Sequence, residues 1–171
     1  MTIRKSNARI ASLGCLAVFL LGAPSANSEP VNQHPGWGLG LMLGYPLGLN
    51  AKYWLGGANA FDLAVGGGPG FRLHGDYEWG LAQVLKDKSD LTLDLYLGVG
   101  GAVAFASGFC GYYGGRFCQD RFFAGVRVPF GVDARLRKAP VDFGLELAPG
   151  IWVGNYVEAL FDGFLFVRYV F

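Results

Sequence analysis

The sequence predicts an all-β fold, an antiparallel up-and-down barrel of eight strands. From residue 36 onward apolar and polar residues alternate, which is the period of strands with two different faces. Gly, Pro and Asn separate the alternating runs, as turns between strands require. The 28 glycines make a helical protein a poor fit. The predicted strands are Gly36–Tyr45, Gly48–Leu55, Ala60–Gly67, Gly70–Trp79, Leu91–Ala104, Arg121–Leu136, Pro140–Ala148 and Leu160–Phe171.

Residues 1–28 have the organisation of a cleaved signal peptide. A basic start is followed by the apolar run Ile10–Gly22 and by small residues that end at Ser28. A lipoprotein site at Cys15 is the weaker alternative, because the apolar run continues past it. Residues 29–35 are expected to be a short leader, and residues 36–171 a single domain.

The charge balance of the mature chain is close to neutral. Removal of the signal peptide takes away three basic side chains and leaves 143 residues with 11 basic and 13 acidic groups. No basic patch indicates a nucleic-acid partner. No later stretch reaches the roughly 18 unbroken apolar residues of a membrane helix.

The charged residues of each predicted strand share one face. In FRLHGDYEWG, residues 71–80, one set of alternate positions holds Arg, His, Asp and Glu, and the other holds Phe, Leu, Tyr and Trp. The polar face also carries glycines such as Gly40, Gly100 and Gly144, which a strand face exposed to water rarely uses. The crowded interior of a narrow barrel needs such empty positions beside long side chains. The charged face is therefore predicted to point into the barrel, and the apolar face toward lipid.

The predicted interior holds a charge network. Eight strands leave a bore that is only wide enough for side chains, so ions enclosed there must pair. The residues assigned to this network are Lys52, Asp62, Arg72, His74, Asp76, Glu78, Asp94, Arg127, Asp133, Arg135, Asp142, Glu146 and Arg168. We interpret them as ion pairs that plug the bore, and a narrow pore for small ions is the alternative.

Aromatic residues gather near the predicted strand ends, as a girdle at a membrane interface requires. The chain stops on FLFVRYVF, and Tyr169 and Phe171 in this segment resemble the terminal signal by which the barrel assembly machinery recognises its substrates. Because lipid offers no hydrogen bonds, every strand must pair on both sides and the sheet must close.

Six short motifs occur in order along the chain: GxPxGL, KYWL, AxD, LHxDY, GVRVPxG and LELAPG. With these motifs the sequence resembles a widespread family of small bacterial outer-membrane barrels of unknown function. The resemblance covers nearly the whole mature chain. It implies an eight-stranded barrel akin to the membrane domain of the OmpA type, and it implies no activity.

Two cysteines remain after processing, Cys110 and Cys118, on either side of GYYGGRF. An exported protein meets an oxidising compartment, so we expect a disulfide that closes the loop between them. The external loops are expected near residues 46–48, 66–70, 105–120 and 149–159. In the third loop, the candidate contacts for an extracellular partner are Tyr112, Tyr113 and Arg116. The alternative is that these aromatics lie in the membrane interface.

A lipid-modifying enzyme is the second alternative function. Such an enzyme needs a nucleophilic hydroxyl with a His and an acid within reach. His74 is predicted inside the barrel, far from Ser107 in the third external loop. We therefore assign no catalytic, cofactor or metal residue. The expected protein is a monomer of the bacterial outer membrane, surrounded by lipid, with a structural or surface-contact role.

Overall fold

A computed structural model describes residues 35–67, 70–85, 90–110, 118–154 and 157–171, without the side chains of 106–110 and 118–121. The predicted signal peptide and almost all of the predicted leader lie outside these ranges. None of the described residues belongs to a helix that could cross a membrane.

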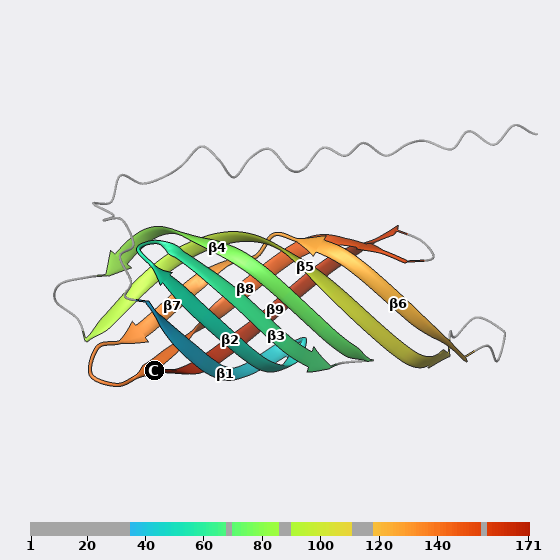
Figure 1. Cartoon of the computed structure of the whole chain (residues 1–171), viewed down its shortest axis with the longest axis horizontal. Coiled ribbons are helices and arrows are strands. Elements are labelled where there is room, and N and C mark those ends of the chain that lie inside the picture. Colours follow the sequence, from blue (N-terminus) through green and yellow to red (C-terminus); the bar gives the residue numbers. More distant parts are fainter. Residues whose placement is uncertain (1–34, 68–69, 86–89, 111–117, 155–156) are drawn as a thin grey trace, which may run out of the picture.

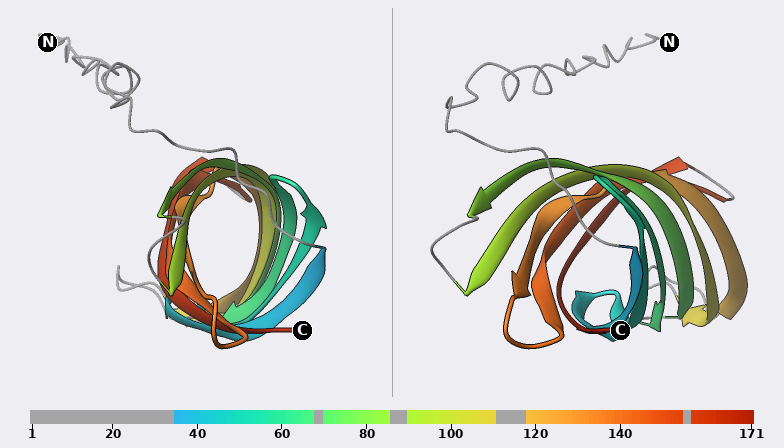
Figure 2. Two further views of the ribbon diagram at one scale, coloured as in Figure 1. Left: turned by 90° about the vertical axis from the view of Figure 1, so that its left-hand side faces the viewer. Right: turned by 60° about the vertical axis from the view of Figure 1, so that its left-hand side comes forward.

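Nine antiparallel strands form one closed ring (Figures 1 and 2). The strands are β1 (Gly36–Tyr45), β2 (Leu47–Gly56), β3 (Asn59–Gly67), β4 (Phe71–Leu85), β5 (Leu91–Cys110), β6 (Cys118–Arg127), β7 (Phe130–Leu136), β8 (Val141–Val153) and β9 (Val157–Val170). From β1 to β5 each strand pairs with the next along the chain. Both β6 and β7 pair with β5 and with β8, and β9 pairs with β8 and β1, which closes the ring.

The stretch predicted as one strand over 121–136 is two strands. The interruption falls at Val128 and Pro129, because proline has no N–H to donate to a ladder. Two backbone hydrogen bonds still tie the interruption to the neighbouring strands. The N–H of Gly98 donates to the carbonyl oxygen of Pro129 at 2.7 Å, and the N–H of Val128 donates to the carbonyl oxygen of Pro149 at 2.9 Å. β6 and β7 therefore continue one after the other between the same two neighbours.

Several strands are longer than predicted, and the loops between them are correspondingly shorter. β5 continues to Cys110, because its backbone pairs with β6 up to the Cys110–Cys118 position. Residues 105–110 and 118–120 of the third predicted loop are thus strand. β8 and β9 also pair up to Val153 and Val157, so the fourth loop is shorter than 149–159.

Side chains on the two faces of the ring differ sharply. Large apolar residues such as Leu41 and Val126 are 57% and 64% exposed on the outside. Charged residues such as Lys52 and Arg168 are 2% exposed on the inside. The alternation of each strand therefore separates an oily outer surface from an ionic interior.

Glycines make room for the interior side chains. A Cβ atom on Gly100 would lie 1.8 Å from the Asp76 carboxylate, and one on Gly144 would lie 2.5 Å from the Phe166 ring. Real Cβ atoms do not approach other atoms so closely. Large inward side chains therefore lie across glycines of the neighbouring strand.

Candidate functional site: the charge network inside the ring

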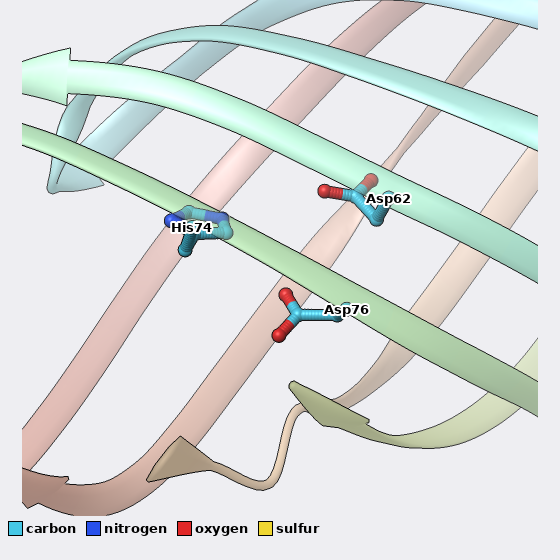
Figure 3. Close-up of side chains that lie close together, drawn as sticks. All are labelled: Asp62, His74 and Asp76. Atoms are coloured by element: carbon cyan, nitrogen blue, oxygen red, sulfur yellow. The ribbon is translucent and has the colours of Figure 1, made fainter. Parts of the chain in front are cut away.

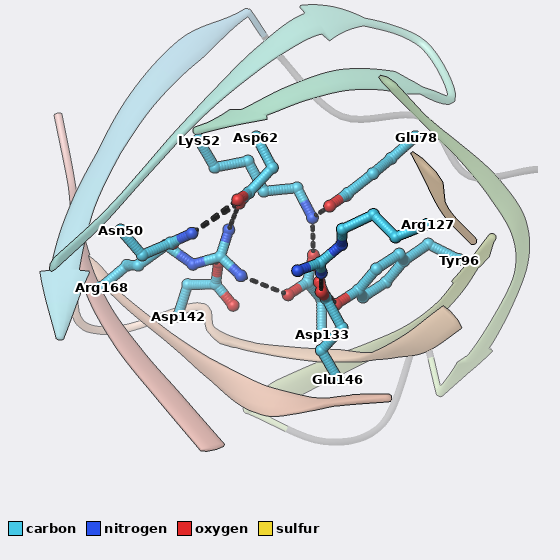
Figure 4. Close-up of polar contacts among 10 residues, drawn as sticks. All are labelled: Asn50, Lys52, Asp62, Glu78, Tyr96, Arg127, Asp133, Asp142, Glu146 and Arg168. Carbon is cyan, nitrogen blue, oxygen red and sulfur yellow. Dashed lines mark hydrogen bonds and ion pairs between the residues drawn. The ribbon is translucent and has the colours of Figure 1, made fainter. Parts of the chain in front are cut away.

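Ion pairs fill the inside of the ring (Figure 4). Fourteen polar side chains there are at most 5% exposed: Asn50, Lys52, Asp62, Arg72, His74, Asp76, Glu78, Asp94, Arg127, Asp133, Asp142, Glu146, Asp162 and Arg168. Because they alternate with outward residues on eight of the nine strands, β2 to β9, the closed sheet itself brings them together.

Lys52 on β2 joins opposite sides of the ring. Its Nζ atom lies 2.5 Å from Asp133 Oδ2 on β7 and 2.6 Å from Glu78 Oε2 on β4. Three strands separate β2 from β7 in either direction around the ring. The pair with Asp133 therefore crosses the bore, and the ring of Tyr96 lies 4.3 Å from the same ammonium group.

Arg168 on β9 contacts carboxylates on three other strands. Its nitrogens lie 3.2 Å from Asp133, 3.5 Å from Asp142 and 3.5 Å from Asp62. The guanidinium also stacks 3.8 Å from the ring centre of Phe166. One cation from the last strand thus connects β3, β7 and β8.

Arg127 on β6 is the centre of a second group of pairs. It contacts Asp162 at 2.9 Å and Asp76 at 3.3 Å, and it pairs with Glu146. The hydroxyl of Tyr96 donates to the other oxygen of Glu146 at 2.9 Å. Each carboxylate in this group comes from a different strand.

Arg72 supplies a second bridge across the bore. It pairs with Asp162, and its guanidinium lies 4.8 Å from the ring centre of Trp152. Arg72 is on β4 and Asp162 on β9, which are separated by β1 to β3 on one side and by β5, β6 and β8 on the other.

Apolar side chains occupy the remaining interior volume. Met42, Ala64, Phe164 and Phe166 form a buried cluster. Beside Lys52 lies a cavity of about 10 Å³, roughly the smallest space that accommodates one water molecule. The interior beside Lys52 therefore has little empty space.

Twelve of the thirteen residues assigned to the network from the sequence are buried inside, and Arg135 is half-buried with its guanidinium 4.2 Å from the Trp54 ring. Asp162 was left out of that assignment although it makes two ion pairs. The alternation does place Asp162 on the inner face, because the adjacent Phe161 is an outward apolar residue. Asp94 accepts a hydrogen bond from Gln83 Nε2 at 2.8 Å.

The residues assigned to the third external loop and to the disulfide lie wholly or partly outside the described part of the chain. Tyr112, Tyr113 and Arg116 lie outside the described residues. The backbones of Cys110 and Cys118 are opposite each other in the β5–β6 ladder, whereas their side chains lie outside the description.

Aromatic rings pack in two rows on the outer surface. Trp37 and Tyr53 have ring centres 4.5 Å apart, and the row continues over the neighbouring strands through Phe61 and Tyr77 at 5.0 Å. The assigned assembly residues Tyr169 and Phe171 are 53% and 70% exposed, with ring centres 5.0 Å apart.

Toward the opposite end of the ring, the rings of Phe105 and Phe122 lie 4.9 Å apart on the outer face. Both side chains are about half exposed.

Asp62, His74 and Asp76 form a compact buried cluster on β3 and β4 (Figure 3). Asp62 lies opposite Asp76 in the ladder, and His74 is two residues before Asp76 on the same face. One ligand-type atom of each residue lies within 4.8 Å of the others. The His74 ring stacks on Phe164, with ring centres 6.0 Å apart.

Comparison with known proteins found no matching family model, no similar curated protein and no similar solved structure. The functional interpretation therefore depends on the sequence and on the geometry of the ring.

Proposed function

We propose that this chain is an integral protein of a bacterial outer membrane, an eight-stranded transmembrane barrel with a plugged bore, and that its role is structural or one of surface contact. The observation that carries the proposal is the reversed distribution of polarity, with apolar side chains outside and ion pairs inside.

The outer surface supports a lipid environment. Leucine, valine and phenylalanine side chains cover the outer face of the ring. Leu41, Val126 and Phe161, on three different strands, are each more than half exposed. Soluble monomers rarely expose continuous apolar patches above a few hundred Å², because burying apolar area from water is favourable. Hydrocarbon chains remove this cost.

The height of the apolar surface also fits a bilayer. On β1, Trp37 and Tyr45 mark the two ends of the exposed apolar row. Eight steps of about 3.3 Å separate them, about 26 Å along the strand. With the strand tilt of about 35–45° usual for such barrels, the row spans about 20 Å along the axis, near the ~25 Å apolar band of outer-membrane proteins.

The strand number is consistent with this class. β6 and β7 lie between the same neighbours, which supports counting them as one interrupted strand of an eight-stranded barrel. Membrane barrels of bacteria have even strand numbers from eight upward, and eight leave space only for side chains.

The interior favours a plug over a pore. The Lys52–Asp133 and Arg72–Asp162 pairs cross the bore between opposite strands. An ion could pass only after these buried pairs had separated, and breaking a buried pair costs about 3–5 kcal/mol when one partner is lost. With the bore closed, contacts with other molecules fall to the outer surface and the loops.

The first experiment tests membrane insertion. The protein, expressed in a Gram-negative host, should fractionate with the outer membrane and migrate differently on gels before and after heating. Recovery of folded protein in the soluble fraction without detergent would overturn the proposal.

The second experiment tests the plug by conductance in planar bilayers. The wild-type protein should be silent, whereas a variant with both Arg72→Ala and Asp162→Ala removes one bridge across the bore and should admit small ions more readily. Steady wild-type currents would instead identify a narrow pore.

A further inference from the structure

The cluster of Asp62, His74 and Asp76 has buried acceptor atoms without donors. His74 Nε2 and both carboxylate oxygens of Asp76 have no hydrogen-bond partner among the described residues, and neither does Asn50 Oδ1 nearby. His74 is 2% exposed and Asp76 3%. An unsatisfied buried polar group costs about 1–3 kcal/mol, and more when it is charged. These atoms are therefore available as ligands for a bound cation.

The positive groups already present leave these carboxylates incompletely neutralised. Arg127 Nε lies 3.3 Å from Asp76 Oδ1, and Arg168 Nη1 lies 3.5 Å from Asp62 Oδ2. Charge-assisted hydrogen bonds are normally about 2.7–2.9 Å long. Asn50 Nδ2 donates to both oxygens of Asp62 at 2.7 and 2.8 Å, which leaves lone pairs on each oxygen.

Two carboxylates directly opposite each other on neighbouring strands repel. Asp62 and Asp76 are such a pair. The surrounding interior adds to the imbalance, because the described residues that are at most 5% exposed include eight carboxylates and only four basic side chains. A divalent ion would offset both the local repulsion and part of this excess.

We propose that Asp62, His74 and Asp76 bind a divalent transition-metal ion of the zinc class. One imidazole and two carboxylates form a donor set that suits Zn²⁺. Figure 3 shows the three side chains close together, with His74 and Asp76 on β4 and Asp62 on the neighbouring β3. The ligand-type atoms lie within 4.8 Å of one another, and tetrahedral coordination with bonds of about 2.1 Å needs separations of about 3.4 Å. Binding the ion would draw the three ligand atoms together by side-chain rotation.

The Asn50 side chain holds one of the three ligand residues in place. Its Oδ1 atom is buried without a partner, and its Nδ2 atom holds Asp62. The ion would tie β2, β3 and β4 together inside the ring. This inference goes beyond the proposed function and does not depend on where the protein resides.

The test uses untagged full-length protein in detergent, stripped with EDTA and titrated with Co²⁺, whose visible absorption reports its coordination. We expect one Co²⁺ ion to bind and Zn²⁺ to displace it. His74→Gln and Asp76→Asn should each weaken binding at least about tenfold. His34→Gln, which removes the other histidine, and Asp90→Asn, which removes an exposed carboxylate, should leave the affinity unchanged.

Absence of a stoichiometric Co²⁺ complex in the wild type would refute the site, as would unchanged affinity in His74→Gln. A second measurement needs no variant: X-ray absorption of the Zn²⁺-loaded wild type should show only nitrogen and oxygen ligands, at about 2.0–2.2 Å. Sulfur ligands at about 2.3 Å would instead place the metal on cysteine and overturn the proposal.

Discussion

Replacing Lys52 by Met removes one cation from the middle of the charge network while keeping most of the apolar volume of the side chain. Lys52 lies 2.5 Å from Asp133 and 2.6 Å from Glu78. Asp133 keeps Arg168 at 3.2 Å, whereas Lys52 is the only cation in ion-pair contact with Glu78 among the described residues. The substitution thus leaves mainly Glu78 buried and uncompensated.

The expected destabilisation follows from the number of cations that each carboxylate keeps. Breaking a buried ion pair by removing one partner destabilises a protein by about 3–5 kcal/mol. Adding Glu78→Gln to Lys52→Met removes the uncompensated charge and should recover about 1–3 kcal/mol of the loss. The double variant should therefore be more stable than the single variant, although it lacks two native charges.

The assay is reversible unfolding by denaturant in lipid vesicles, followed by tryptophan fluorescence and by the heat-dependent gel shift. Lys138→Met is the matched control, because Lys138 pairs with Asp90 at 2.7 Å with both side chains more than half exposed. Its effect should stay below about 1 kcal/mol. Equal effects of Lys52→Met and Lys138→Met, or a further loss on adding Glu78→Gln, would refute the reasoning.

Two pairs of substitutions test the outer and inner faces. Leu41→Arg, midway between Trp37 and Tyr45 on the outer face of β1, should destabilise the vesicle-inserted state by about 2–4 kcal/mol. Val157→Arg, at the first residue of β9, should cost about 0–1 kcal/mol. Equal costs would contradict a bilayer at this height. Gly144→Ala, whose new Cβ would lie 1.9 Å from the Val132 carbonyl oxygen, should cost about 1–3 kcal/mol of unfolding free energy. Gly75→Ala is the control, because the atom nearest to its new Cβ lies 3.6 Å away. It should change the unfolding free energy by no more than about 0.5 kcal/mol in the same denaturant titration. A similar loss at both positions would show that interior crowding does not require the glycines.

The alternation of polar and apolar residues predicted which side of each strand points into the ring. Each strand has a period of two, so one charged residue such as Lys52 fixes the orientation of its whole strand. The alternation does not reveal the interruption at Pro129, because Arg127 and Asp133 on either side of it occupy inward positions of the same alternating series. Only the missing N–H of proline distinguished it from a continuous strand.

Strand ends and pairing partners were harder to predict. β4 continues past Trp79, where register shifts at Gly80/Ala82 and Gln83/Leu85 disturb the alternation that would have revealed it. The partners of each charge depend on how far the strands are staggered around the ring. Residues as distant as Lys52 and Asp133 meet only after closure, and the spacing within one strand does not encode that distance.

Arg168 gives the last strand an influence beyond its own hydrogen bonds. Without β9, β1 would keep an unpaired edge, and Asp62, Asp133 and Asp142 would lose a shared counter-ion. A prematurely terminated polypeptide would then be incomplete in two independent ways, one in its main chain and one in its electrostatics.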